Sequence, residues 1–96
     1  MVTGNPLAIL KSMKPGETAM VVFNEYNRMR TFTVQLSDYN NIVGPKLGVF
    51  VHASSKKRHL KMFLVAVTAA EHDAEMADIN LRNEWRKKLP EEWLNQ

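Results

Sequence analysis

The sequence predicts a single small α+β domain, in which a three-stranded antiparallel sheet is covered by a central helix and a long C-terminal helix. Runs of β-branched and apolar residues predict strands over 18–23, 48–54 and 59–68. Helical spacing of apolar residues dominates 24–43 and again 69–89. With 96 residues, 45% of them hydrophobic and 24% charged with both signs mixed, the chain has the size and composition of one globular domain, residues 1–96.

The first element is a short helix that starts at Asn5. The Asn5 side chain can cap a helix, and Pro6 suits the first helical position because that position needs no backbone donor. Apolar residues then recur at helical spacing over 7–13. The Lys-Pro-Gly-Glu segment 14–17 predicts a type II turn, which leads into the strand 18–23.

Residues 24–47 fit two patterns. A helix is indicated by a stripe of apolar residues, namely Met29, Phe32, Leu36, Tyr39 and Val43, with Asn24 as its cap and Gly44-Pro45 as its stop. A strand is indicated by the alternation over 31–36, with a hairpin turn through 24–27. The helix is favoured because the stripe continues beyond Ser37, where the alternation fails.

The next two segments, 48–54 and 59–68, read as a hairpin joined by the loop 54–58. The second half of 59–68 is apolar at every position, which is typical of a strand buried on both faces. We therefore expect 59–68 to be the central strand of the sheet.

The last long element is predicted as one helix over 69–89, followed by a short tail, 90–96. Its stripe consists of Ala70, Ala74, Ala77, Leu81 and Trp85. Acidic residues in its first turns and basic residues in its last turn complement the helix dipole. Pro90 ends it.

Charge is distributed unevenly along the chain. Residues 1–68 hold nine lysines and arginines against three acids, whereas residues 69–96 hold four against seven. Four cations fall within six residues of the predicted hairpin tip, namely Lys56, Lys57, Arg58 and Lys61. Such a tip can contact phosphates on either side of a groove. Further candidates for the same patch are Arg28, Arg30 and Lys46.

The leading functional hypothesis is therefore non-catalytic nucleic-acid binding. DNA is favoured over RNA, because no aromatic-rich RNA-binding signature is present. The plain alternative is a solvated turn, in which exposed lysines discourage aggregation at a sheet edge.

A second hypothesis, from another class, is a protein-interaction module that binds and inhibits a partner or forms a homodimer through the C-terminal helix. The candidate interface residues are Leu81, Trp85, Trp93 and Leu94. Tryptophan is enriched at the energetic centres of interfaces.

Enzymatic and cofactor chemistry is not expected. The carboxylates of 71–78 lack a partner base or nucleophile, and we expect them on a solvated helix face. His52, His59 and His72 lack the spacing of a metal site and are expected at the surface. The chain has no cysteine, no signal-peptide pattern and no apolar run long enough to span a membrane, so we expect a cytoplasmic protein.

Residues 11–67 resemble small phage and prophage proteins. The resemblance is carried by Lys14-Pro-Gly-Glu-Thr18, a strand, a helix bearing Leu36-Ser-Asp-Tyr39, and two further strands. It implies a βαββ unit with a basic hairpin, and DNA contact or inhibition of a host protein as roles. The long C-terminal helix departs from that pattern, and no functional residue is carried over.

Overall fold

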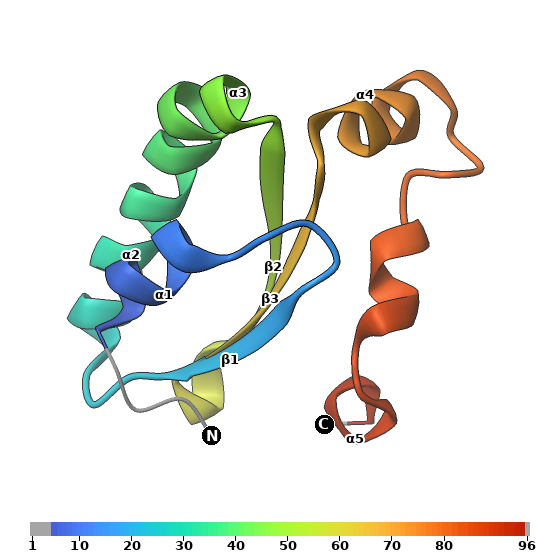
Figure 1. Cartoon of the computed structure of the whole chain (residues 1–96). Helices are drawn as coiled ribbons and strands as arrows, with labels where there is room; N and C mark the ends of the chain where they lie inside the picture. Colours follow the sequence, from blue (N-terminus) through green and yellow to red (C-terminus); the bar gives the residue numbers. More distant parts are fainter. Residues whose placement is uncertain (1–4, 96) are drawn as a thin grey trace.

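A computed structural model of the chain describes residues 5–95, which form one antiparallel sheet with helices on both faces (Figure 1). The strands are β1 (Thr18–Val22), β2 (Val49–Lys56) and β3 (Lys61–Thr68). Their order in the sheet is β1-β3-β2, so the α+β class and the central position of β3 are confirmed. No helix within residues 5–95 is long and apolar enough to cross a bilayer.

The two faces of the sheet carry separate hydrophobic cores. One core lies under α1 (Pro6–Ser12) and α2 (Tyr26–Asp38), where Met62, Leu64 and Ala66 of β3 point. The other lies under the C-terminal segment and receives the alternate β3 residues Phe63, Val65 and Val67. Because both faces are covered, β3 has six consecutive buried residues and no polar alternation.

The N-terminal predictions hold in detail. The Asn5 side chain accepts a 2.9 Å hydrogen bond from the Leu7 N–H and caps α1. The predicted turn follows, with the Glu17 N–H donating to the Lys14 carbonyl and Gly16 at φ 91°. Gly16 also forms a β-bulge, since its N–H donates to the Ala66 carbonyl while the Ala66 N–H donates to the Glu17 carbonyl.

The helical interpretation of 24–47 is confirmed, and the strand alternative is excluded. The N-cap residue is Glu25, not the predicted Asn24, and its side chain makes no capping hydrogen bond to the helix. Gly44-Pro45 is not the stop that the sequence predicted. A π-helical turn (Tyr39–Val43) follows α2, in which the Gly44 N–H donates to the Tyr39 carbonyl, and the chain continues as α3 (Gly44–Leu47).

Two residues explain this continuation. Pro45 lies in the first turn of α3, where a missing N–H costs nothing. Gly44 is buried, and a Cβ added to it would lie 2.4 Å from the Val49 carbonyl oxygen, so only glycine fits there. The helix ends instead at Gly48, which has φ 71°.

The predicted helix over 69–89 is wrong, and its apolar stripe does not exist as one face. Helix α4 (Ala69–Ala77) is followed by turns, the 3₁₀ helix η3 (Glu84–Lys88) and α5 (Glu91–Leu94). Asp78 is extended and accepts a 2.9 Å side-chain hydrogen bond from the Asn80 N–H, which competes with helical bonding. The break returns the chain along the second face of the sheet (Figure 1).

Candidate functional site

The basic tip, defined as Lys56, Lys57, Arg58 and Lys61, is a tightly built turn. Lys56 and Lys61 face each other across the end of the hairpin, and the 3₁₀ turn η2 (Lys57–His59) joins the strands. Leu60 closes the turn at φ 52°, a left-handed conformation that is uncommon for leucine. The Leu60 side chain packs on the core under α1 and α2, and the Leu60 carbonyl accepts a 2.8 Å hydrogen bond from the Phe23 N–H. Both the side chain and the backbone of Leu60 therefore hold the tip in place.

The four cations of the basic tip differ in exposure. Lys57 and Arg58 are exposed, and neither forms an ion pair with an acid in residues 5–95. Lys56 and Lys61 are half-buried, and the Lys56 ammonium lies 5.7 Å from the centre of the Trp93 ring. Lys57 and Arg58 are therefore the cations most available to a polyanion.

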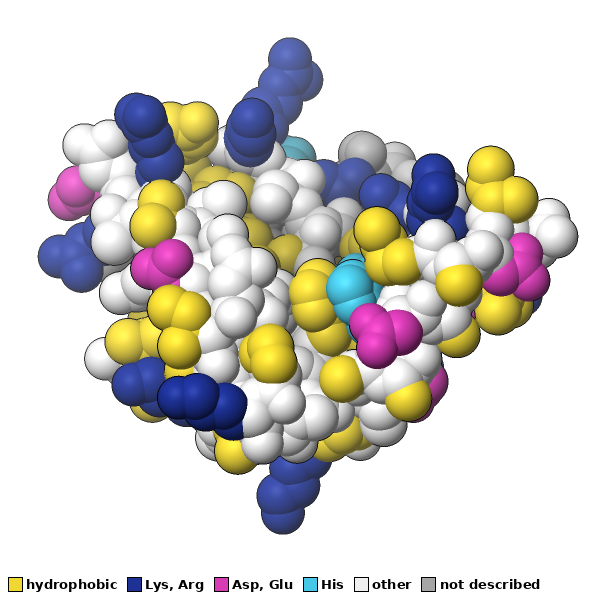
Figure 2. Space-filling model, turned by 90° about the horizontal axis from the view of Figure 1, so that it is seen from above, with side chains coloured by type: hydrophobic (Ala, Val, Ile, Leu, Met, Phe, Trp, Pro, Cys, Tyr) yellow, Lys and Arg dark blue, Asp and Glu magenta, His cyan; other side chains and the backbone are white. Residues whose placement is uncertain are grey.

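Of the other predicted contact residues, the structure brings two to the end of the molecule that holds the basic tip. Arg28 and Arg30 are exposed in the first turns of α2, which begins close after the Phe23–Leu60 hydrogen bond. Lys46 precedes β2, whereas the tip follows it, and an eight-residue strand spans roughly 25 Å. Lys46 therefore does not extend the patch. Figure 2 looks onto the opposite end, where basic side chains are scattered among hydrophobic ones.

The predicted interface residues separate into two kinds. Trp85 and Trp93 are buried in the second core, and the Trp93 indole N–H donates a 2.9 Å hydrogen bond to the Ser54 hydroxyl. The chain's own fold therefore accounts for both tryptophans. Leu81 and Leu94 are 38% and 54% exposed.

A cluster that the sequence analysis missed lies between β2, α4 and η3. The His52 ring stacks on Trp85 with centres 4.7 Å apart, and its Nε2–H donates to the Glu75 carboxylate at 2.8 Å. His72 stacks on Phe50 at 3.6 Å. Glu75 is buried, contrary to the expected solvated face, and neither His52 nor His72 is fully exposed.

Burial lowers the pKa of His52, and the hydrogen bond and charge of Glu75 only partly oppose that effect. Within residues 5–95, no group of three or more histidine, cysteine and acidic side chains is arranged to hold a metal ion. A signal was available in the sequence, because Phe50 and His52 share a strand face and His72 and Glu75 share a helix face. The cluster connects β2, α4 and η3, and we interpret it as a contact that stabilises the fold.

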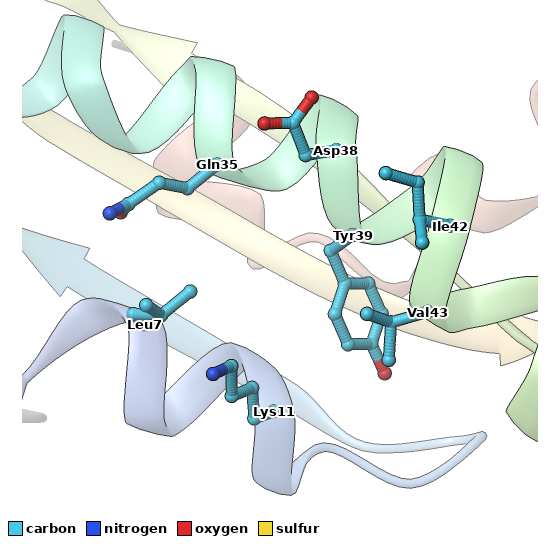
Figure 3. A pocket seen from close by; sticks show the side chains of 7 residues that line it. All are labelled: Leu7, Lys11, Gln35, Asp38, Tyr39, Ile42 and Val43. Atoms are coloured by element: carbon cyan, nitrogen blue, oxygen red, sulfur yellow. The ribbon is translucent and has the colours of Figure 1, made fainter.

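A small pocket lies between α1 and the end of α2 (Figure 3). Its volume is about 200 Å³, and its walls, to which Leu7, Ile42 and Val43 contribute, are almost entirely apolar. Tyr39 also lines it, and its buried hydroxyl has no hydrogen-bond partner within residues 5–95. Burial raises the pKa of Tyr39. Lys11 and Asp38 also line the pocket, but no pair of groups suited to acid–base chemistry converges among its described lining residues.

Of these features, the basic tip combines exposure, charge and a fixed backbone, and it is the strongest candidate for a functional surface. Comparisons with protein-family models, with curated proteins and with solved structures find no match to this chain.

Proposed function

We propose that this chain is a non-catalytic nucleic-acid-binding protein that contacts phosphates through the basic tip. The observation that carries the proposal is the pair of exposed cations, Lys57 and Arg58, on a hairpin turn that Leu60 anchors to the core. A fixed turn presents these charges without the entropy cost of ordering a mobile loop. Arg28 and Arg30 supply further positive charge at the same end.

The charge balance supports the same proposal. The chain carries a net charge of +3, and its excess of lysine and arginine lies in residues 1–68. Phosphate contacts of this kind release counterions and give affinity without base-specific readout. DNA is the preferred partner in this proposal, and single-stranded DNA and RNA are the alternatives to compare.

The test is a fluorescence titration of a 20-base-pair DNA duplex at several salt concentrations. If four to six phosphates are neutralised, the log–log slope of affinity against salt is about −4 to −5. The double variant Lys57→Ala/Arg58→Ala should reduce the magnitude of that slope by about 2.

A matched control removes the same charge away from the basic tip. Lys14 and Lys46 are exposed and lie toward the other end of the sheet. Lys14→Ala/Lys46→Ala should change the slope by less than about 0.5. Equal losses in the two double variants would show that net charge, and not the basic tip, carries the affinity. Absence of binding by the wild-type protein at low salt would refute the proposal.

A second candidate function, protein interaction through the C-terminal segment, is favoured by one observation. Met76, Ile79 and Leu81 are 62%, 73% and 38% exposed over α4 and the turns that follow it. Exposed apolar side chains gathered in one segment are typical of contact surfaces. Replacing Met76 and Ile79 by serine should abolish capture of a partner protein while leaving the fold unchanged, and unaltered capture would reject this surface.

A further inference from the structure

Both outer strands of the sheet have a free edge in principle, because β3 occupies the centre. In an antiparallel pair, alternate residues direct their N–H and C=O groups toward the neighbouring strand, and the residues between them direct these groups outward. An outward row of unpaired groups is a template for another strand. The edges of β1 and β2 differ in whether other residues bond to these outward groups.

The edge of β2 is partly closed by the side chain of Asn40. The Asn40 amide donates a 2.9 Å hydrogen bond to the Val51 carbonyl, and its oxygen accepts one of 2.9 Å from the Val51 N–H. The carboxamide thus takes the place of a neighbouring strand at Val51. It reaches this position because the π-helical turn lies beside β2.

Within residues 5–95, no side chain covers the edge of β1 in this way. Inward hydrogen bonds fix its two ends, since the Ala66 N–H donates to the Glu17 carbonyl and the Phe23 N–H donates to the Leu60 carbonyl. The alternation between these points directs the backbone groups of Thr18, Met20 and Val22 outward. No residue within 5–95 bonds to these outward groups.

Within the described residues, the arrangement of the helices leaves this edge accessible. In Figure 1, β1 is the strand nearest to the viewer, and no helix crosses in front of it. Its sequence, Thr-Ala-Met-Val-Val, has neither a charge nor a proline, which are the usual devices against edge pairing. Val22 is 41% exposed.

We propose that β1 pairs antiparallel with β1 of a second copy of this chain, about a two-fold axis at Met20. Thr18 of one copy then lies opposite Val22 of the other, and Met20 lies opposite its own counterpart. Each of these pairs exchanges two N–H···O bonds, so every outward group of β1 is used. The dimer then contains one continuous six-stranded sheet. Its formation does not depend on nucleic-acid binding.

The charges that flank β1 favour antiparallel pairing, and they favour a second copy of this chain as the partner strand at this edge. Lys14 precedes β1 and Glu25 follows it, so antiparallel pairing brings the lysine of each copy toward the glutamate of the other. The basic tip lies at the Val22 end of β1, through the Phe23–Leu60 hydrogen bond. Antiparallel pairing sends the two tips to opposite ends, whereas parallel pairing would place them together.

Amide hydrogen exchange measured by NMR at two protein concentrations tests the pairing directly. In the monomer, the N–H groups of Ala19 and Val21 face β3 and should be protected, whereas those of Met20 and Val22 face outward and should exchange rapidly. At the concentration where sedimentation shows a dimer, Met20 and Val22 should exchange at least about tenfold more slowly.

A pair of valine-to-lysine variants provides the control. Val22→Lys should weaken dimerisation at least about tenfold, because a lysine on an edge strand opposes pairing. Val34→Lys changes a 59% exposed residue on α2 and should leave dimerisation unchanged. A monomer at all concentrations, a dimer without new protection at Met20 and Val22, or protection that appears only when a different protein is added would each overturn the proposal.

Discussion

The Nε2 atom of His52 lies 2.8 Å from a carboxylate oxygen of Glu75, although the two residues are 23 positions apart. The contact joins the edge strand β2 to α4, and the stacking of His52 on Trp85 joins both to η3. Glu75 is buried, and a buried carboxylate without a hydrogen-bonding partner would be strongly destabilising. The pair therefore holds together the segments that cover the second face of the sheet.

This contact predicts a loss of stability in weak acid. The pKa of His52 lies below its ordinary value of 6.5 because of burial, with the charge of His72 acting in the same direction and Glu75 opposing both. The unfolded chain therefore binds a proton at this residue more readily than the folded chain does. The resulting stability is complete above about pH 6.5 and is lost as the pH falls through the lowered folded pKa.

Thermal unfolding between pH 7.5 and 5 provides the measurement. The melting temperature of the wild type should fall more steeply across this range than that of His52→Gln. The control is His59→Gln, which alters an exposed histidine at the hairpin turn and should keep the wild-type slope. Parallel profiles for wild type and His52→Gln would contradict the assignment.

Gly44→Ala should destabilise the fold, although alanine normally favours a helix over glycine. The added methyl group would lie 2.4 Å from the Val49 carbonyl, so the backbone between α3 and β2 must shift. We expect the free energy of unfolding in urea to fall by about 1 to 3 kcal/mol. Lys46→Ala, in the same helix but exposed, should change it by less than about 0.5 kcal/mol. A Gly44→Ala protein as stable as the wild type would exclude the close approach.

Trp93→Ala should be among the most damaging single substitutions in the chain. Trp93 is 4% exposed, packs on Phe63 and bonds to Ser54, so its removal should cost about 3 to 5 kcal/mol in chemical unfolding. Leu94→Ala, at a 54% exposed neighbour, should cost less than about 0.5 kcal/mol. Deleting residues 90–96 should match the tryptophan variant. An unchanged melting temperature after this deletion would show that Trp93 is not part of the core and would support its role as an interface residue.

Asn40→Ala should open the edge of β2. The substitution removes two hydrogen bonds to Val51, and we expect a loss of about 1 to 2 kcal/mol in unfolding free energy. The Val51 amide should also exchange faster with solvent. Asn41→Ala alters the exposed neighbour and should leave both quantities unchanged. Equal behaviour of the two variants would show that the carboxamide does not protect this edge.

Elements whose signals are local were predictable from the sequence. Asn5-Pro6 and Pro15-Gly16 specify a helix start and a turn by the conformations and hydrogen bonds available to those residues. The stripe of α2 and the unbroken apolar run of β3 report which faces are buried, and both were interpreted correctly. The same holds for the position of the basic cluster at a hairpin turn.

Elements that depend on contacts between distant residues could not be predicted in this way. The periodicity of 69–89 extends past Asp78, yet the chain breaks there and returns to place Trp85 and Trp93 on the second face of the sheet. Gly44-Pro45 has the composition of a stop, but the approach of Val49 and the preceding π-helical turn make it the start of α3.

The sequence by itself determined the sheet, the central helix and the charge of the hairpin tip, because backbone preference and periodicity act over a few residues. The tertiary structure alone decided that Glu75 is buried against His52 and that Asn40 closes one edge of the sheet, whereas no residue within 5–95 closes the edge of β1. Those outcomes depend on which distant segments pack against one another. The free energy that favours this packing comes from the burial of side chains that lie far apart in the sequence.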